Sequence, residues 1–220
     1  MSHSSIMPMV YKGKKMYVYC AIGGLCGVSA EGSDKGKILW ETPAFSPAVI
    51  APSPLILDDG LIYMTAGYGA GAALVQVKQS NGTFSAELVE QYKPQAGLAS
   101  EQQTPIFYKG NIFGILPKDA GEFRGQFACY KSNNTHKVVM SSGKTTRYGL
   151  GPYILADNKF FILNDDGELT IAKASPSGFV LLDRQKIIDG QDSWGPLAIT
   201  GGYLIMRDSK QMVCLDIKAK

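Results

Sequence analysis

One pattern of residues recurs five times along the chain and restricts the folds open to it. Each copy begins at a proline and continues as a short apolar stretch, a two-residue turn and a second apolar or aromatic stretch. The copies begin at intervals of 46, 51, 47 and 44 residues, at Pro8, Pro54, Pro105, Pro152 and Pro196. The turn pairs are Lys12-Gly13, Asp59-Gly60, Lys109-Gly110, Asp157-Asn158 and Gly201-Gly202. Residues of these types accept the positive φ angles of tight turns, so the pattern predicts five β-hairpins.

Every hairpin is followed by a further strand, and each of the first four is followed by two. The third strands are predicted at residues 26–30, 74–78, 127–131, 169–173 and 212–216. The fourth strands are predicted to begin at Ile38, Phe84, Val138 and Phe179. Four strands in a period of this length are typical of a propeller blade, whereas the strands of a sandwich show no such long period.

We therefore predict an all-β fold, a β-propeller of four-stranded antiparallel blades, with about four complete blades and a fifth of three strands. The blades are expected over residues 8–46, 53–93, 104–145, 151–190 and 195–220, in a single domain covering residues 1–220. Propellers commonly complete the last blade with a strand from the N-terminal end, and residues 1–7 are short for that role but could fill it. Blade edges that stay open would instead favour self-association.

Aromatic residues occupy nearly the same position in the second strand of four copies: Tyr17, Tyr63, Phe113 and Phe161. Aromatic side chains supply much of the apolar area that is buried when sheets pack. We predict that these four side chains pack between blades.

The Gly36-Lys37 pair allows two interpretations, a phosphate-binding loop or a turn. A phosphate-binding loop requires a preceding strand, spaced glycines and a following helix. Here Ile38-Leu39-Trp40 follows, which is typical of a strand. We predict a turn between the third and fourth strands of the first blade, with Trp40 packed in that blade.

The net charge and the small number of histidine and cysteine residues argue against several classes of site. The formal net charge of +3 comes from scattered residues, so it predicts neither a nucleic-acid footprint nor a membrane-surface one. No apolar run of about 18 residues occurs, so we expect no membrane span, and no signal peptide is visible. With two histidines and four cysteines that lack C-x-x-C spacing, neither a metal site nor a Ser-His-Asp arrangement is expected.

Two segments resemble the repeat of a known family. They are AEGSDKGKILWE at residues 30–41 and MVCLDIK at residues 212–218, and family-like stretches also occur at residues 66–77, 192–199 and 201–216. They resemble the PQQ-like β-propeller repeat family, whose blade signature runs approximately alanine, any residue, aspartate, two residues, Thr-Gly-Lys, two residues and tryptophan. That family includes quinoprotein dehydrogenases and the outer-membrane protein assembly factor of the BamB type.

Members of this family are typically exported and usually carry about eight blades. The resemblance therefore implies a periplasmic or extracellular location, and either the C-terminal portion of a longer protein or a short member. Members that bind the quinone carry a vicinal cysteine pair, an acidic and amide set that holds calcium, and a tryptophan floor. No Cys-Cys pair occurs here, and Asp58-Asp59 and Asp165-Asp166 each precede a glycine at a hairpin turn. We expect no cofactor, neither PQQ nor its calcium ion.

Loops between strands two and three, and loops between successive blades, form the expected binding surface, because connections on a rigid scaffold commonly carry function. The candidate residues in these loops are Tyr68, Arg124, Arg147, Tyr148 and Trp194, whose types are enriched at interface hot spots. Trp194 fits equally well as a wedge between blades. The leading interpretation is a non-catalytic scaffold that binds a protein or peptide partner. The alternative is an enzyme, either a degenerate quinoprotein dehydrogenase or a carbohydrate-active propeller.

Overall fold

The computed structural model describes residues 2–218 as five antiparallel sheets that follow one another in chain order. Blade 1 contains β1 (Met7–Tyr11), β2 (Lys14–Ala21), β3 (Gly24–Ser29) and β4 (Ile38–Thr42). Blade 2 contains β5 (Leu55–Ile56), β6 (Leu61–Ala66), β7 (Gly71–Ser80) and β8 (Thr83–Tyr92). Blade 3 contains β9 (Ile106–Tyr108), β10 (Asn111–Ile115), β11 (Phe127–Lys131) and β12 (Asn134–Ser141).

Blade 4 contains β13 (Tyr153–Ala156), β14 (Lys159–Leu163), β15 (Glu168–Lys173) and β16 (Leu181–Lys186). Blade 5 contains β17 (Ala198–Thr200), β18 (Tyr203–Arg207) and β19 (Met212–Asp216). Three short 3-10 helices lie in the connections: η1 (Asp58–Gly60), η2 (Pro94–Ala96) and η3 (Gly121–Phe123). Four sheets of four strands and one of three confirm the propeller-blade fold that the repeat predicts.

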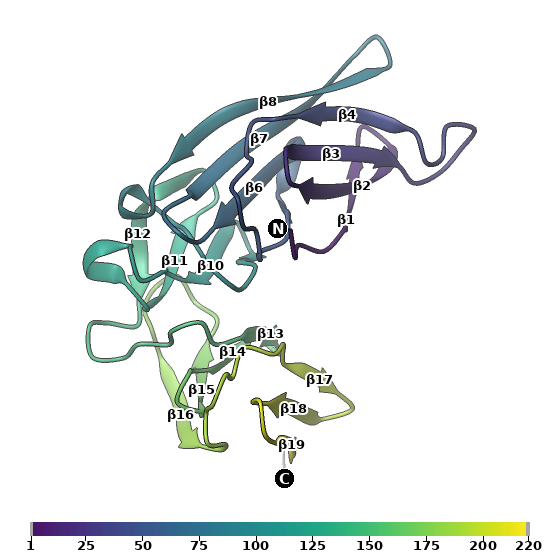
Figure 1. Ribbon diagram of the computed structural model, residues 1–220. Helices are drawn as coiled ribbons and strands as arrows, with labels where there is room; N and C mark the ends of the chain where they lie inside the picture. The colour runs from purple at the N-terminus through teal and green to yellow at the C-terminus, as the bar shows by residue number, and fades with distance from the viewer. Residues whose placement is uncertain (1, 219–220) are drawn as a thin grey trace.

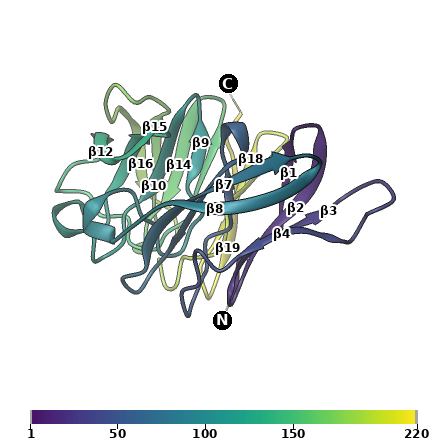
Figure 2. The same ribbon diagram turned by 90° about the horizontal axis from the view of Figure 1, so that it is seen from above.

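The blades are arranged as an arc, with blades 1 and 2 at one end, blade 3 in the middle and blades 4 and 5 at the other end (Figure 1). The view turned by 90° shows β8 of blade 2 extending toward the strands of blade 1 (Figure 2), where it contacts β4. Within residues 2–218, no strand pairs blade 5 with blade 1, so strand pairing does not close the arc.

Four apolar clusters fill the spaces between neighbouring blades. From blade 1 to blade 5, the facing pairs include Met16 with Met64, Tyr63 with Ile112, Phe113 with Phe160, and Phe161 with Leu204. Successive residues of a strand point to opposite faces of its sheet, so one strand contributes to the cluster before its blade and to the cluster after it. This stacking holds the connections between blades at a common end of the molecule.

The aromatic positions show how sensitive this stacking is to register. Tyr63, Phe113 and Phe161 pack between blades as predicted, with 1%, 0% and 6% of their surface exposed. The prediction for Tyr17 was wrong, because its side chain is 48% exposed and Met16 fills the buried position. Met16 lies three residues after the last residue of its hairpin turn, and the three buried aromatics lie at the same distance from theirs. Counting from the proline instead selected Tyr17, which is one residue too far along the strand. A shift of one residue exchanges the two faces of a strand.

The boundaries of two fourth strands differ from the prediction. Blade 4 begins its fourth strand at Leu181, two residues later than predicted, and Phe179 instead packs against the cluster between blades 3 and 4. Blade 3 begins its fourth strand at Asn134, four residues earlier than predicted. Register shifts occur where both strands pair with their neighbours, so side-chain alternation cannot be counted through them.

The N-terminal segment does not complete blade 5. The amide of His3 donates a hydrogen bond to the carbonyl oxygen of Ile50 at 2.8 Å, and the amide of Ser5 donates to Ser53 Oγ at 2.8 Å. The Ser2 hydroxyl donates to the carbonyl oxygen of Cys20 at 2.6 Å. Residues 2–5 therefore lie against blade 1 and its connection to blade 2.

The stretch around Gly36 is a turn, as predicted. The amide of Gly36 donates to the carbonyl oxygen of Ser29 at 2.9 Å, and the Lys14 ammonium lies 2.6 Å from Asp34 Oδ1. Trp40 is buried between blades 1 and 2, where its Nε1–H donates to Met16 Sδ at 3.3 Å. The β3–β4 connection leads into a strand, so it has no helix to bind a phosphate.

Candidate partner-binding groove

The predicted site residues all lie at one end of the blades, which we call the loop face. It is formed by the connections between second and third strands and by those between successive blades. Tyr68 lies in the β6–β7 turn and Arg124 in the β10–β11 connection. Arg147 and Tyr148 lie between blades 3 and 4, and Trp194 lies between blades 4 and 5.

A groove of 440 Å³ opens on the loop face between blades 3 and 4, a volume typical of ligand pockets. It brings together two of the predicted residues, Arg124 and Arg147, with Lys118. Its other charged residues are Glu101 and Asp165. A recess of 10 Å³ adjoins the groove and shares Glu101 and Leu150 with it, which is space for about one water molecule.

The three cations of the groove are exposed, but two of them are held in place. Arg147 donates a hydrogen bond from Nη1 to the carbonyl oxygen of Arg124, so the guanidinium is fixed beside the β10–β11 connection. The Lys118 ammonium lies 5.7 Å from the centre of the Tyr68 ring, a distance at which the ring attracts a cation. Tyr68 is thereby linked to the groove, although it does not line it.

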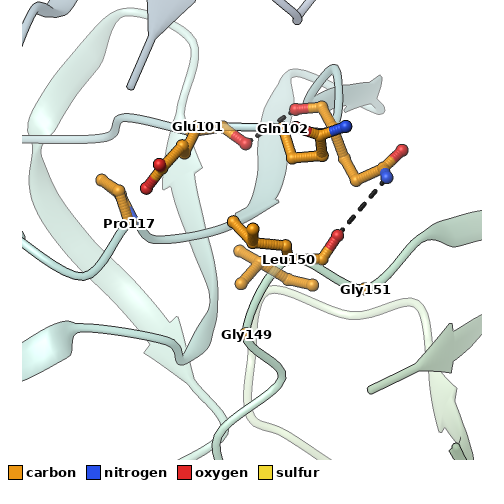
Figure 3. A pocket seen from close by; sticks show the side chains of 9 residues that line it. Glu101, Gln102, Pro117, Gly149, Leu150 and Gly151 are labelled. Carbon is orange, nitrogen blue, oxygen red and sulfur yellow. Dashed lines mark hydrogen bonds between the residues drawn. The ribbon is translucent and has the colours of Figure 1, made fainter. Parts of the chain in front are cut away.

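The carboxylates of the groove are directed toward the protein itself. Burial raises the pKa of Asp165 above its ordinary value, and the Leu150 amide and the Trp194 side chain oppose that rise by hydrogen bonding. The Leu150 amide lies 3.0 and 3.1 Å from the two carboxylate oxygens. The Glu101 side chain extends toward Pro117, with Leu150 across the recess (Figure 3). The charged groups that face outward from the groove are therefore the three cations rather than the two carboxylates.

One glutamine joins the connections that form the floor of the loop face. Gln103 Nε2 donates to the carbonyl oxygen of Leu150 at 3.4 Å and to that of Trp194 at 3.2 Å. Gln103 follows blade 2, Leu150 precedes blade 4, and Trp194 precedes blade 5. A single side chain thus fixes three connections, which keeps the spacing between neighbouring loops constant.

Tyr148 does not belong to the binding surface. Its side chain is fully buried, and its ring packs edge-on against Phe127 with the ring centres 6.5 Å apart. Trp194, by contrast, is 43% exposed and lies beside Asp165 at the border of the groove. The two residues have similar chemistry and similar loop positions, so only the folded structure distinguishes them.

Sequence reasoning missed Lys118, Glu101 and Asp165. A signal for Lys118 was present, because residues 116–126 form the longest connection between a second and a third strand and carry both Lys118 and Arg124. Glu101 and Asp165 come from connections more than 60 residues apart, and no local pattern links them.

Two of the four cysteines lie in blade 1. Cys20 pairs with Leu25 across the β2–β3 ladder, whereas Cys26 pairs with Tyr19, so the two sulfur atoms lie on opposite faces of blade 1. All four cysteines are free. In residues 2–218, no three His, Cys, Asp or Glu side chains are grouped to hold a metal ion. In the same part of the chain, no helix has the length and apolar character needed to cross a membrane.

Comparisons with known proteins support the fold. No protein-family model matches the sequence, and no curated protein matches it. Apo AztD from Citrobacter koseri has a TM-score of 0.51 at 12% identity, over 98% of this chain and 57% of that protein. The computationally designed Ika4 protein has a TM-score of 0.50 at 12% identity, over 74% of this chain and 88% of Ika4. BamB from Moraxella catarrhalis has a TM-score of 0.47 at 12% identity, over 94% of this chain and 70% of BamB.

Identities this low indicate the fold alone, and the chain spans little more than half the length of AztD. The five successive antiparallel sheets and these structural likenesses lead to one conclusion: the chain has a β-propeller fold.

Proposed function

We propose that the chain is a non-catalytic propeller domain of the PQQ-like repeat type that binds an acidic segment of a protein or peptide partner. The binding site is the groove between blades 3 and 4. The observation that carries the proposal is the cluster of three exposed cations, Lys118, Arg124 and Arg147, around a pocket whose carboxylates face the protein.

Side chains that are already ordered before binding lower the entropic cost of binding. Arg147 is already held by the Arg124 carbonyl oxygen, so little side-chain entropy is lost when a carboxylate arrives. Arginine presents several donors in one plane, which suits a carboxylate. Trp194 at the border of the groove supplies an aromatic surface for an apolar residue next to the acidic one.

The resemblance of residues 30–41 and 212–218 to the PQQ-like repeat supports a scaffold role in the cell envelope or outside the cell. It also supports the view that the chain forms a single propeller domain. A cofactor is not part of the proposal, because the sequence has no Cys-Cys pair of the kind found in members that bind the quinone.

The test is selection of short random peptides on the purified protein, followed by titration of one enriched peptide. We expect enrichment of Asp and Glu. The double variant Arg124→Ala/Arg147→Ala should weaken binding by about tenfold or more, because two charge-assisted contacts are lost.

The matched control is Lys131→Ala/Lys173→Ala, which removes the same charge from exposed residues at the opposite ends of blades 3 and 4. It should leave the affinity unchanged. Peptides without an excess of acidic residues, or equal affinity for both double variants, would exclude this groove as the binding site.

A further inference from the structure

The recess beside the loop-face groove contains a single carboxylate. Among the nine described residues that line it, Glu101 alone carries a charge. Glu101 also lines the groove itself, so its side chain belongs to both spaces. The recess lies where three connections meet: Glu101 follows blade 2, Pro117 belongs to the β10–β11 connection, and Leu150 precedes blade 4. The charge of the recess is therefore opposite to that of the cations in the outer groove.

The Glu101 carboxylate makes neither a hydrogen bond nor an ion pair with any side chain or backbone group of residues 2–218. Three cations line the same groove, but two of them are engaged elsewhere. The Lys118 ammonium lies at the Tyr68 ring, and Arg147 donates to the carbonyl oxygen of Arg124. Glu101 is partly exposed, so its oxygens are free to accept hydrogen bonds from a ligand.

The path of the Glu101 side chain explains how it reaches the recess. The side chain passes over Gly67 in the β6–β7 connection, where an added Cβ would lie 2.3 Å from Glu101 Cγ. The φ angle of Gly67 is not positive, so the close approach, rather than the backbone conformation, accounts for a glycine here. Beyond Gly67 the side chain extends toward Pro117, with Leu150 across the recess (Figure 3). The carboxylate is therefore held beside the recess.

The walls of the recess are fixed by hydrogen bonds. Gln103, which lines the recess, donates to the carbonyl oxygens of Leu150 and Trp194. The Leu150 amide donates in turn to the Asp165 carboxylate. The Asp165 oxygens are thereby occupied, which leaves Glu101 as the acceptor for a cation. Walls held in this way keep the recess small when a ligand binds.

We propose that the recess binds the ammonium group of a lysine side chain, which the partner segment carries beside its acidic residues. The acidic residues contact the three outer cations, and the lysine contacts Glu101. This lysine site rests on the proposed function, because both contacts are made in one groove, and it defines the partner more closely as a segment with both signs of charge. Complementary charges across an interface determine which partners are accepted.

The size of the recess favours lysine over arginine. An ammonium group is about the size of a water molecule, and the recess of 10 Å³ has space for about one water. The planar guanidinium of an arginine carries its donors on a wider group. The methylene stem of a bound lysine would lie along Leu116 and Leu150, whose apolar side chains line the adjoining groove.

The probes are fluorescein-labelled peptides whose ends carry no charge. The lysine peptide is Gly-Leu-Asp-Lys-Asp-Leu-Gly, and glutamine or arginine replaces the lysine in two matched peptides. Binding to the full chain is measured by fluorescence anisotropy. The glutamine peptide has the larger net negative charge, so the three outer cations alone would favour it. We expect the lysine peptide to bind about tenfold more tightly than either matched peptide, because it alone forms a charge-assisted hydrogen bond in the recess.

Two protein variants identify the residue that recognises the lysine. Glu101→Gln removes the charge but keeps the shape of the side chain, so it should bind the lysine and glutamine peptides with similar affinity. The matched control is Glu122→Gln. Glu122 lies in η3, its side chain is 64% exposed, and it lines neither the groove nor the recess. The control variant should keep the preference for lysine.

Equal binding of the lysine and glutamine peptides by the parent protein would overturn the lysine site, and so would a lysine preference that Glu101→Gln retains. Neither result contradicts the proposed function, which requires that Arg124→Ala/Arg147→Ala weaken binding of the glutamine peptide. Tighter binding of the arginine peptide than of the lysine peptide would mean that the cation lies outside the recess. Absence of binding by all three peptides would overturn both proposals.

Discussion

His136 Nε2 lies 2.7 Å from Glu90 Oε1, and the Nδ1 atom of the same ring lies 2.6 Å from the carbonyl oxygen of Ala96. Both partners are acceptors, so the ring satisfies both contacts only when both of its nitrogens carry protons. The histidine comes from β12 of blade 3, whereas Glu90 and Ala96 belong to blade 2 and the connection that follows it. Protonated His136 therefore links two blades.

The link predicts a pH-dependent stability. The pKa of His136 is raised chiefly by the hydrogen bond to Ala96; burial opposes this rise, and the hydrogen bond and charge of Glu90 add smaller contributions to it. A pKa that is higher in the folded state stabilises the protein below the ordinary histidine pKa of about 6.5, and this contribution is lost as pH rises through the raised value. Because the pair is exposed, the expected contribution is about 0.2–1 kcal/mol.

Urea unfolding of His136→Ala at acidic and alkaline pH measures this contribution. The variant should be less stable than the parent at acidic pH, and the two curves should converge at alkaline pH. Lys137→Ala, on the neighbouring exposed residue, should show no such convergence. The His136 ring also packs against Tyr92, with the ring centres 4.6 Å apart. A constant difference at all pH values would mean that His136 acts only through this packing.

Asp165 predicts a pH dependence of the same direction as His136, beginning at lower pH. Its pKa is raised mainly by burial, so the folded protein holds the proton more tightly than the unfolded chain does. The contribution of Asp165 to the free energy of unfolding should therefore fall as pH rises from the ordinary Asp pKa of about 3.9 through the raised value. Asp165→Asn keeps an acceptor for the Leu150 amide without the charge, so it should gain stability relative to the parent between acidic and neutral pH. Parallel pH profiles of unfolding would contradict this prediction.

Substitution of Tyr148 should lower the stability of the protein rather than its affinity for the acidic peptide. Truncation to alanine leaves a cavity beside Phe127 and should lower the free energy of unfolding by about 3–5 kcal/mol. Tyr148→Phe keeps the ring and should bind the acidic peptide as tightly as the parent. Weaker peptide binding by a stably folded Tyr148→Phe variant would mean that the Tyr148 hydroxyl contributes to binding.

The two tryptophans should report on different environments. Trp40 is 4% exposed and Trp194 is 43% exposed. Trp194→Phe should leave an emission at shorter wavelength that acrylamide quenches weakly, whereas Trp40→Phe should leave one at longer wavelength that acrylamide quenches strongly. If the acidic peptide binds in the loop-face groove, it should change the emission of the Trp40→Phe protein only. Strong quenching in both variants would contradict the burial of Trp40.

The amino-acid sequence by itself determined the blade repeat. Five hairpin turns, the third strands and the polar turn at Gly36 were predictable, because turn chemistry and alternation of apolar residues are local properties. Local rules also placed Arg124, Arg147 and Trp194 in connections at one end of the blades. The same rules failed at Tyr17, because the buried face depends on a register that must be counted from the turn.

Only the tertiary structure decided which loop residues meet. Lys118, Arg124, Arg147, Glu101 and Asp165 lie around one groove because blades 3 and 4 stack through Phe113 and Phe160, which are 47 residues apart. Burial of Tyr148 and exposure of Trp194 follow from the same packing. The physical reason is that stacking of sheets fixes long-range distances between side chains, whereas residue order along the chain fixes only local geometry.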